Sequence, residues 1–182
     1  MKAETVRLHG ELDEVVRRCN ALAVSLDDEA LMRRPAPESW SVAENLEHLS
    51  ATAATFSRRI RRRLDAATTS DTFSREKKSL VGRVWLGLVE PPVRVRLKVP
   101  AAALQPGEIV SRDALLARFA ETHATLIALL DESDSYDRMR LRIPSAFAKR
   151  ITVTLYDAFI VLAAHGRRHL WQATEAKLKI EN

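Results

Sequence analysis

Apolar residues recur at spacings of three and four in four stretches of the chain, about residues 4–26, 41–65, 111–130 and 154–177. This periodicity puts them on one face of a helix, so each stretch is predicted to be an amphipathic α-helix. In the first stretch these positions are Leu8, Leu12, Val15, Cys19, Leu22 and Leu26. With only 5 Gly in 182 residues, a turn-rich β protein is disfavoured. We expect an all-α fold, a four-helix bundle formed by residues 1–182 as a single domain.

Capping residues mark the starts of three of these segments. They are Ser41 with Glu44, Ser111 with Asp113, and Thr154 with Asp157. A Ser or Thr side chain at the N-cap accepts a hydrogen bond from an unpaired backbone N–H, and an acidic residue in the first turn complements the helix dipole. These pairs therefore indicate where three of the four helices begin.

The connection between the second and third helices, about residues 66–110, is long for a compact domain. We expect a loop at 66–72, a short helix at 75–88 and an extended connector at 94–99, because one alternating segment without a strand partner does not make a sheet. An acidic loop is expected at 131–138 and an irregular segment at 141–150. Long crossovers of this kind are often functional.

Composition limits the class of protein further. Apolar residues make up 46% and charged residues 29% of the chain, a soluble globular profile. No apolar run approaches the length of about 18 residues that a membrane span needs, and the N-terminus has no signal-peptide core. We therefore expect a cytoplasmic protein with no membrane partner. The single Cys19 excludes an internal disulfide and a cysteine-rich zinc site.

Two histidines, His165 and His169, lie four residues apart on the apolar face of the last predicted helix. Side chains at this spacing are neighbours on a helix surface. Two imidazoles so placed can hold one metal ion, because neutral imidazole is a common metal ligand. Two histidines buried in the core by hydrogen bonds remain the alternative interpretation.

His48 lies early in the second helix, at the flank of its apolar face. If the second and fourth helices are antiparallel, the start of one meets the later part of the other, and His48 converges with His165 and His169. Three nitrogen ligands and an open position are typical of catalytic rather than structural zinc. Nickel, iron and manganese are also compatible with such a site.

Several other residues are candidates for a second layer around the metal or for substrate contact. His123 replaces an apolar residue on the third helix, where a core hydrogen bond is the simpler expectation. The remaining candidates are Glu44, Glu47, Asp157, Arg167 and Arg168; for the two arginines, solvated cations at a helix end are the favoured interpretation. His9 is expected at the surface. No carboxylate stands out as a general base.

A strongly basic segment spans residues 58–98, with twelve Lys or Arg and four Asp or Glu. It begins with five arginines in six positions, 58–63, and raises the hypothesis of a nucleic-acid partner. The helical spacing puts these arginines on an outer face, and no aromatic residues interleave to stack bases. A solvated basic face is therefore the favoured interpretation.

The order of motifs resembles the DinB/YfiT-like superfamily of helical-bundle proteins. The resemblance rests on Trp40-Ser41 before the second helix, on Glu47-His48-Leu49 within it, and on the late His165-x-x-x-His169-Leu-x-Gln172. It implies an up-down-down-up four-helix bundle with a long crossover between the second and third helices. It also implies one divalent metal ion held by His48, His165 and His169, and frequent homodimers.

Characterised members of that superfamily include thiol-dependent S-transferases, so the resemblance implies a small-molecule substrate, with a low-molecular-weight thiol as a candidate partner. The leading hypothesis from the sequence is a metal-dependent transferase or hydrolase. A non-catalytic binding module of the same fold is the alternative. The long basic crossover departs from the family pattern, so the substrate is not carried over.

Overall fold

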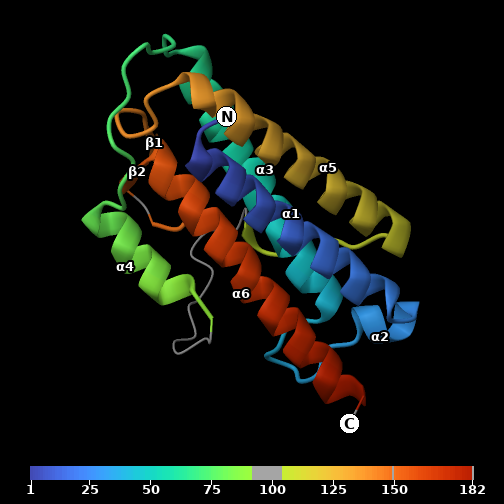
Figure 1. Cartoon of the computed structure of the whole chain (residues 1–182). Helices are drawn as coiled ribbons and strands as arrows, with labels where there is room; N and C mark the ends of the chain where they lie inside the picture. Colours follow the sequence, from blue (N-terminus) through green and yellow to red (C-terminus); the bar gives the residue numbers. More distant parts are fainter. Residues whose placement is uncertain (92–103, 149, 182) are drawn as a thin grey trace.

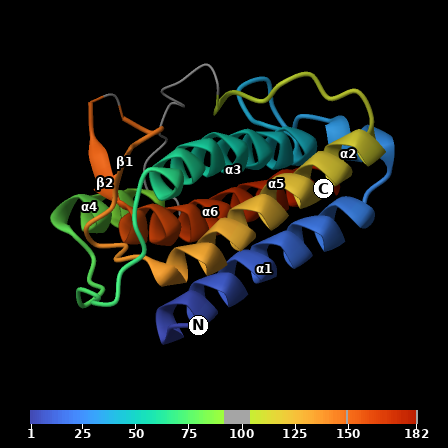
Figure 2. The ribbon, with the colours of Figure 1, turned by 90° about the horizontal axis from the view of Figure 1, so that it is seen from above.

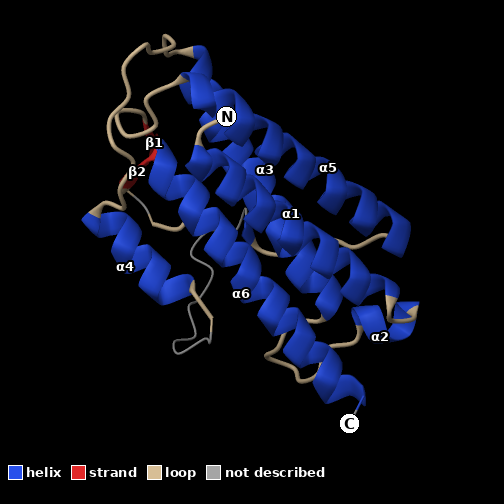
Figure 3. Cartoon of the chain, viewed as in Figure 1, coloured by secondary structure: helices blue, strands red, loops and turns tan. Residues whose placement is uncertain are grey.

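The computed structural model of the chain describes residues 1–91, 104–148 and 150–181. The described elements are α1 (Ala3–Val24), α2 (Asp28–Met32), α3 (Val42–Asp65), α4 (Leu80–Val89), α5 (Arg112–Glu132), a 3-10 turn (Ser133–Ser135), β1 (Arg142–Pro144), β2 (Thr152–Thr154) and α6 (Leu155–Glu181). The long helices α1, α3, α5 and α6 are the four that apolar periodicity predicts. The all-α bundle is therefore confirmed (Figure 3).

The four long helices are arranged up-down-down-up. α1 and α6 run in one direction, and α3 and α5 run in the other (Figure 1). Seen from above, α1 and α3 lie on opposite sides of the bundle, and each packs against α5 and α6 (Figure 2). Because α3 and α5 are parallel neighbours, the chain between them must return along the length of the bundle, which explains the long crossover.

The core lies between the inward faces of these helices. Leu8, Phe56, Phe119 and Phe159 are among its fully buried side chains. Cys19 is also fully buried, and burial raises the pKa of its thiol to about 12. Within the described part of the chain, none of the helices is long and apolar enough to span a membrane.

Two short elements were not expected from the sequence. The sequence predicts an irregular segment at 141–150, but β1 in this segment pairs with β2 in an antiparallel hairpin whose central pair is Ile143 and Val153. Each strand has only three residues, too few for alternation to stand out. The five-residue helix α2, begun by the Asp27 side chain, was missed for the same reason.

Helix α4 is shorter than the helix predicted at 75–88. It begins at Leu80, with the Ser79 side chain accepting a hydrogen bond from the Gly82 N–H. The preceding residues are not helical because polar contacts hold them elsewhere: Ser74 donates to Asp137, and Glu76 accepts from Arg138. The extended connector expected at 94–99 lies outside the described residues.

One buried carboxylate serves the first turns of two helices. Asp157 is fully buried. Its N–H donates to the Thr154 hydroxyl, which in turn donates to Asp157 Oδ2 at 2.8 Å. Asp157 Oδ1 accepts the Ser79 N–H at 3.1 Å, at the start of α4. A Cβ atom on Gly82 would lie 2.1 Å from the same oxygen, so glycine is needed for this close approach.

Replacing Gly82 should therefore destabilise the protein, and Gly87 provides a control in the same helix. In Gly82→Ala the new methyl group forces Asp157 off its hydrogen bonds, which should lower the free energy of unfolding by about 1–3 kcal/mol. Gly87 has nothing within 4 Å of its Cβ position, so Gly87→Ala should raise stability by up to about 1 kcal/mol. Urea unfolding monitored by circular dichroism measures both, and equal stabilities would contradict the packing argument.

Candidate metal centre

The structure brings His48, His165 and His169 together inside the bundle. His48 lies in the second turn of α3, after the capping box that Ser41 and Glu44 form. His165 and His169 lie one turn apart on α6, which is antiparallel to α3. One candidate ligand atom from each ring lies within 4.8 Å of the other two, and all three residues are buried. Within the described ranges, this is the one such group of histidine, cysteine and carboxylate residues.

The spacing of the rings suits a shared ion. The Nε2 atoms of His48 and His165 are 3.1 Å apart. Two nitrogens bound to the same zinc ion at about 2.0–2.1 Å each are separated by a similar distance. The ring centre of His169 lies 4.4 Å from that of His48 and 4.5 Å from that of His165. The three imidazoles therefore converge on one small volume.

Hydrogen bonds to the far ring nitrogens fix the orientation of two of these histidines. His48 Nδ1 contacts the Leu104 carbonyl oxygen at 2.5 Å, and His169 Nδ1 contacts Asn45 Oδ1 at 2.9 Å. Both partners are acceptors, so both Nδ1 atoms carry the proton and both Nε2 atoms keep a lone pair. Asn45 is held in turn because its amide donates to the Ser41 carbonyl. Such partners are the usual support of metal-binding histidines.

Aromatic rings enclose the three histidines. The Trp40 ring centre lies 4.9 Å from that of His48 and 5.8 Å from that of His169. On the other side, the Phe147 ring centre lies 5.0 Å from that of His165. All three histidines are buried, and burial strengthens electrostatic interactions within the site.

Burial keeps the three imidazoles neutral. It lowers the pKa of His48, and it lowers the pKa values of His165 and His169 well below the usual range. For the latter two, positive charge on the other histidines and on Arg168 acts in the same direction. At neutral pH each ring therefore offers a lone pair without first losing a proton.

The two glutamates considered from the sequence are engaged by other residues. Glu44 completes the capping box and pairs with Arg34. Burial alone would raise the pKa of Glu44, but the bonds from Arg34 and Ser41 outweigh it and lower that pKa. Glu47 is buried beside Arg118 and the Gly107 N–H, and burial raises its pKa. Neither carboxylate joins the histidine group.

His123 and Asp157 are held by other contacts. His123 is buried on α5, and its Nδ1–H donates to the Phe119 carbonyl at 2.8 Å. Burial lowers the pKa of His123 to about 4. It does not belong to the three-histidine group. Asp157 lies eight residues before His165 on α6, about 12 Å along the axis, and caps α4 instead.

The two arginines between the histidines take different positions. Arg168 is buried and donates to the Leu88 carbonyl at the end of α4, and burial lowers its pKa. Arg167 forms a two-pronged ion pair with Glu90 and a single ion pair with Glu11. Arg167 therefore connects α6 to α1 and to the residue that follows α4.

Part of the basic segment 58–98 makes contacts within the protein. Arg61 pairs with Glu132 and Asp65, and Arg59 donates to the Pro144 carbonyl. These contacts join α3 to the end of α5 and to β1. The arginines and lysine at 94–98 lie outside the described residues.

Sequence reasoning did not identify the residues that support the histidines. Asn45 could have been found, because it lies three residues before His48 and so faces the same side of the helix. Trp40 is part of the Trp40-Ser41 pair on which the family resemblance rests, but that pair did not indicate a contact with the histidines, and Phe147 lies in an irregular segment without any signal. The Leu104 carbonyl is a backbone group on the far side of the crossover and leaves no trace in the sequence.

Comparisons with known proteins agree with this geometry. Residues 11–173 match the family model described as the DinB superfamily. The uncharacterized protein YuaE of Bacillus subtilis is 30% identical over 156 residues, which cover 86% of this chain and 88% of that protein. YfiT of Bacillus subtilis, described as a probable metal-dependent hydrolase with an unusual four-helix bundle topology, superposes with a TM-score of 0.63 at 16% identity. That alignment covers 100% of this chain and 90% of YfiT. With a family match over most of its length, the chain belongs to the DinB superfamily.

Proposed function

We propose that His48, His165 and His169 bind one divalent metal ion and that the protein is a metal-dependent hydrolase of small molecules. The observation that carries the proposal is the convergence of three buried, neutral imidazoles, two of them oriented through Nδ1. YfiT, which shares the fold, is described as a probable metal-dependent hydrolase. Zinc, nickel, iron and manganese all accept nitrogen ligands of this kind.

The chain itself contributes orientation and exclusion of water. Leu104 and Asn45 hold the rings of His48 and His169, while Trp40 and Phe147 close the sides of the site. When bound, a divalent ion supplies a Lewis acid that activates water or a thiol at neutral pH. Among the described residues no carboxylate joins the histidines, so the proposed ligand set is made of nitrogens alone.

Metal binding should depend on His48, His165 and His169. The wild-type protein, prepared without a histidine tag, should bind about one Zn²⁺ or Ni²⁺ per chain, and His165→Ala should bind at least about tenfold more weakly. His9→Ala is the matched control, because His9 is partly exposed and pairs with Asp131 and Asp13. Elemental analysis after dialysis measures the metal. Substoichiometric metal in the wild type, even after Zn²⁺ or Ni²⁺ is added, would contradict a metal site.

Asn45 should support the site through His169. Asn45→Ala removes the acceptor of the Nδ1–H and should weaken metal binding by about 10–100-fold. Asn45→Asp keeps an oxygen at this position, while both variants lose the amide that donates to Ser41. Metal affinity measured by competition with a chromogenic chelator should therefore separate the two variants. Equal affinities would show that the His169 contact is unimportant.

Hydrolysis should require the same residues as metal binding. A panel of carboxylic esters, amides and phosphoesters should show turnover that a chelator abolishes and that added metal restores. His165→Ala should reduce kcat/KM by at least about 100-fold, whereas His9→Ala should leave it unchanged. Low-molecular-weight thiols with electrophiles form a second arm. Metal-dependent conjugation without hydrolysis would replace the hydrolase assignment by an S-transferase.

A further inference from the structure

Helix α4 is apolar on all sides although it lies at the outside of the bundle. Arg83 is the one charged residue among the ten from Leu80 to Val89. The helix packs against α6, at the edge of the bundle (Figure 1). A helix that is apolar all round is normally buried in a core. The outer side of α4 therefore needs an explanation that the fold does not supply.

The inner side of α4 is fixed by apolar packing. Val89 is buried in a cluster with Val161 and Ala164 of α6, and Trp85 and Leu86 pack against the same cluster. These contacts hold the helix in one rotational position about its axis. The residues on the opposite side are therefore held outward.

The outer side of α4 carries Leu80, Val84 and Gly87, which we call the α4 strip. Their spacings of four and three place them on one face of the helix. Leu80 is 79% exposed and Val84 is 63% exposed, and nothing lies within 4 Å of the Cβ position of Gly87. Arg83 is exposed beside them. Two apolar side chains in successive turns are thus left largely uncovered.

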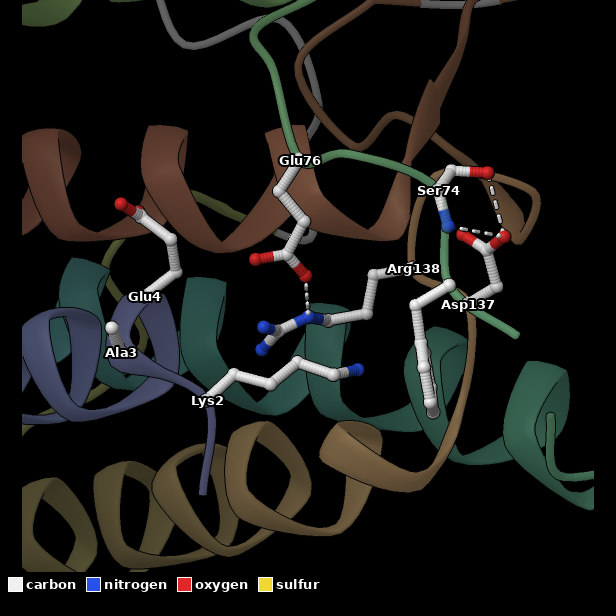
Figure 4. A pocket seen from close by; sticks show the side chains of 8 residues that line it. Lys2, Ala3, Glu4, Ser74, Glu76, Asp137 and Arg138 are labelled. Atoms are coloured by element: carbon white, nitrogen blue, oxygen red, sulfur yellow. Dashed lines mark hydrogen bonds and ion pairs between the residues drawn. The ribbon is translucent and has the colours of Figure 1, made fainter. Parts of the chain in front are cut away.

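Exposed cations precede the α4 strip. Arg75, Lys77 and Lys78 lie in the five residues before α4, and all three are exposed. Within the described part of the chain, none of the three forms an ion pair. The acidic residue among them, Glu76, is turned inward, where it accepts from the buried Arg138 (Figure 4). The apolar strip is therefore bordered by positive charge that Glu76 does not neutralise at the surface.

We propose that α4 and the basic residues before it bind the surface of a membrane rich in anionic phospholipid. The α4 strip would enter the boundary between headgroups and acyl chains, and the cations would pair with lipid phosphates. The expectation of no membrane partner drawn from the sequence rests on the absence of a spanning segment, and a peripheral contact needs none. This contact is independent of the proposed metal site.

Two other partners match only one of these two features. Nucleic acid would pair with the cations, but its phosphates offer no apolar surface to Leu80 and Val84. A second copy of the chain would cover the α4 strip, but in a twofold contact the cations of the two copies would face and repel one another. An anionic bilayer supplies phosphates and acyl chains together.

Vesicle sedimentation of the full chain tests the proposal. At about 0.1 M salt, the protein should bind vesicles with about one third phosphatidylglycerol in phosphatidylcholine at least about tenfold more tightly than vesicles of phosphatidylcholine alone. Raising the salt to about 0.5 M should release most of the protein, because salt screens exposed charges. No binding at low salt, or equal binding to both kinds of vesicle, would overturn the proposal.

Substitution of Val84 tests the apolar contact. Val84→Gln should weaken binding to the anionic vesicles by about fivefold, because less apolar surface leaves water. Val24→Gln is the matched control, since Val24 is 71% exposed at the end of α1, on the other side of the molecule from α4 (Figure 1). Its affinity should stay within about twofold of the wild type. Equal binding of Val84→Gln and wild type would rule out a role for the α4 strip.

Paired substitutions test the cations. Lys77→Gln with Lys78→Gln should weaken binding by about 10–30-fold. Arg17→Gln with Arg18→Gln removes the same charge from an exposed part of α1 and should change affinity by less than about threefold. An equal loss in both double variants would mean that net charge alone drives binding. If sedimentation equilibrium shows that Val84→Gln dissociates an oligomer of the free protein, a second copy covers the α4 strip and the lipid proposal fails.

Discussion

The parallel orientation of α3 and α5 is the constraint on which the rest of the structure depends. Two parallel helices cannot be joined by a tight turn, so the chain must return about 30 Å before α5 begins. Much of that return lies on the outside of the bundle, where it needs its own anchors. Asp137, Arg138 and Asp157 hold its first part through Ser74, Glu76 and Ser79, and Arg168 holds the end of α4.

The interior of the bundle is also polar. Four of the five histidines of the chain are buried, and burial lowers the pKa of each of them. A helical core of this size could be filled by leucine and phenylalanine at lower cost, since buried polar groups require partners. His123 satisfies one nitrogen within its own helix, whereas the other three point toward one another. A histidine that is bonded within its own helix, such as His123, is explained by core packing, whereas three histidines that face one another are candidate metal ligands.

Much of the fold, but less of the site, could be predicted from the sequence. Apolar spacing and capping pairs predict the four long helices, because both signals are local. The antiparallel pairing of α3 and α6 then brings His48 to His165 and His169. The hairpin at β1 and β2 is too short to show a period, and the Glu76–Arg138 pair joins residues 62 positions apart. Asn45 could be predicted from its position three residues before His48, but only after His48 is identified as a ligand.

The hydrogen bond from His48 to the Leu104 carbonyl has a thermodynamic consequence. It connects a ring of the histidine cluster with the backbone at the end of the crossover. Binding of an ion that requires this orientation of the His48 ring would also favour the position of Leu104 in which its carbonyl accepts the hydrogen bond. By linkage, holding Leu104 in that position would favour ion binding. Ion binding at the histidines and the position of the buried Leu104 are therefore coupled, so a substitution in the crossover that shifts Leu104 should change the affinity of the site without altering a histidine.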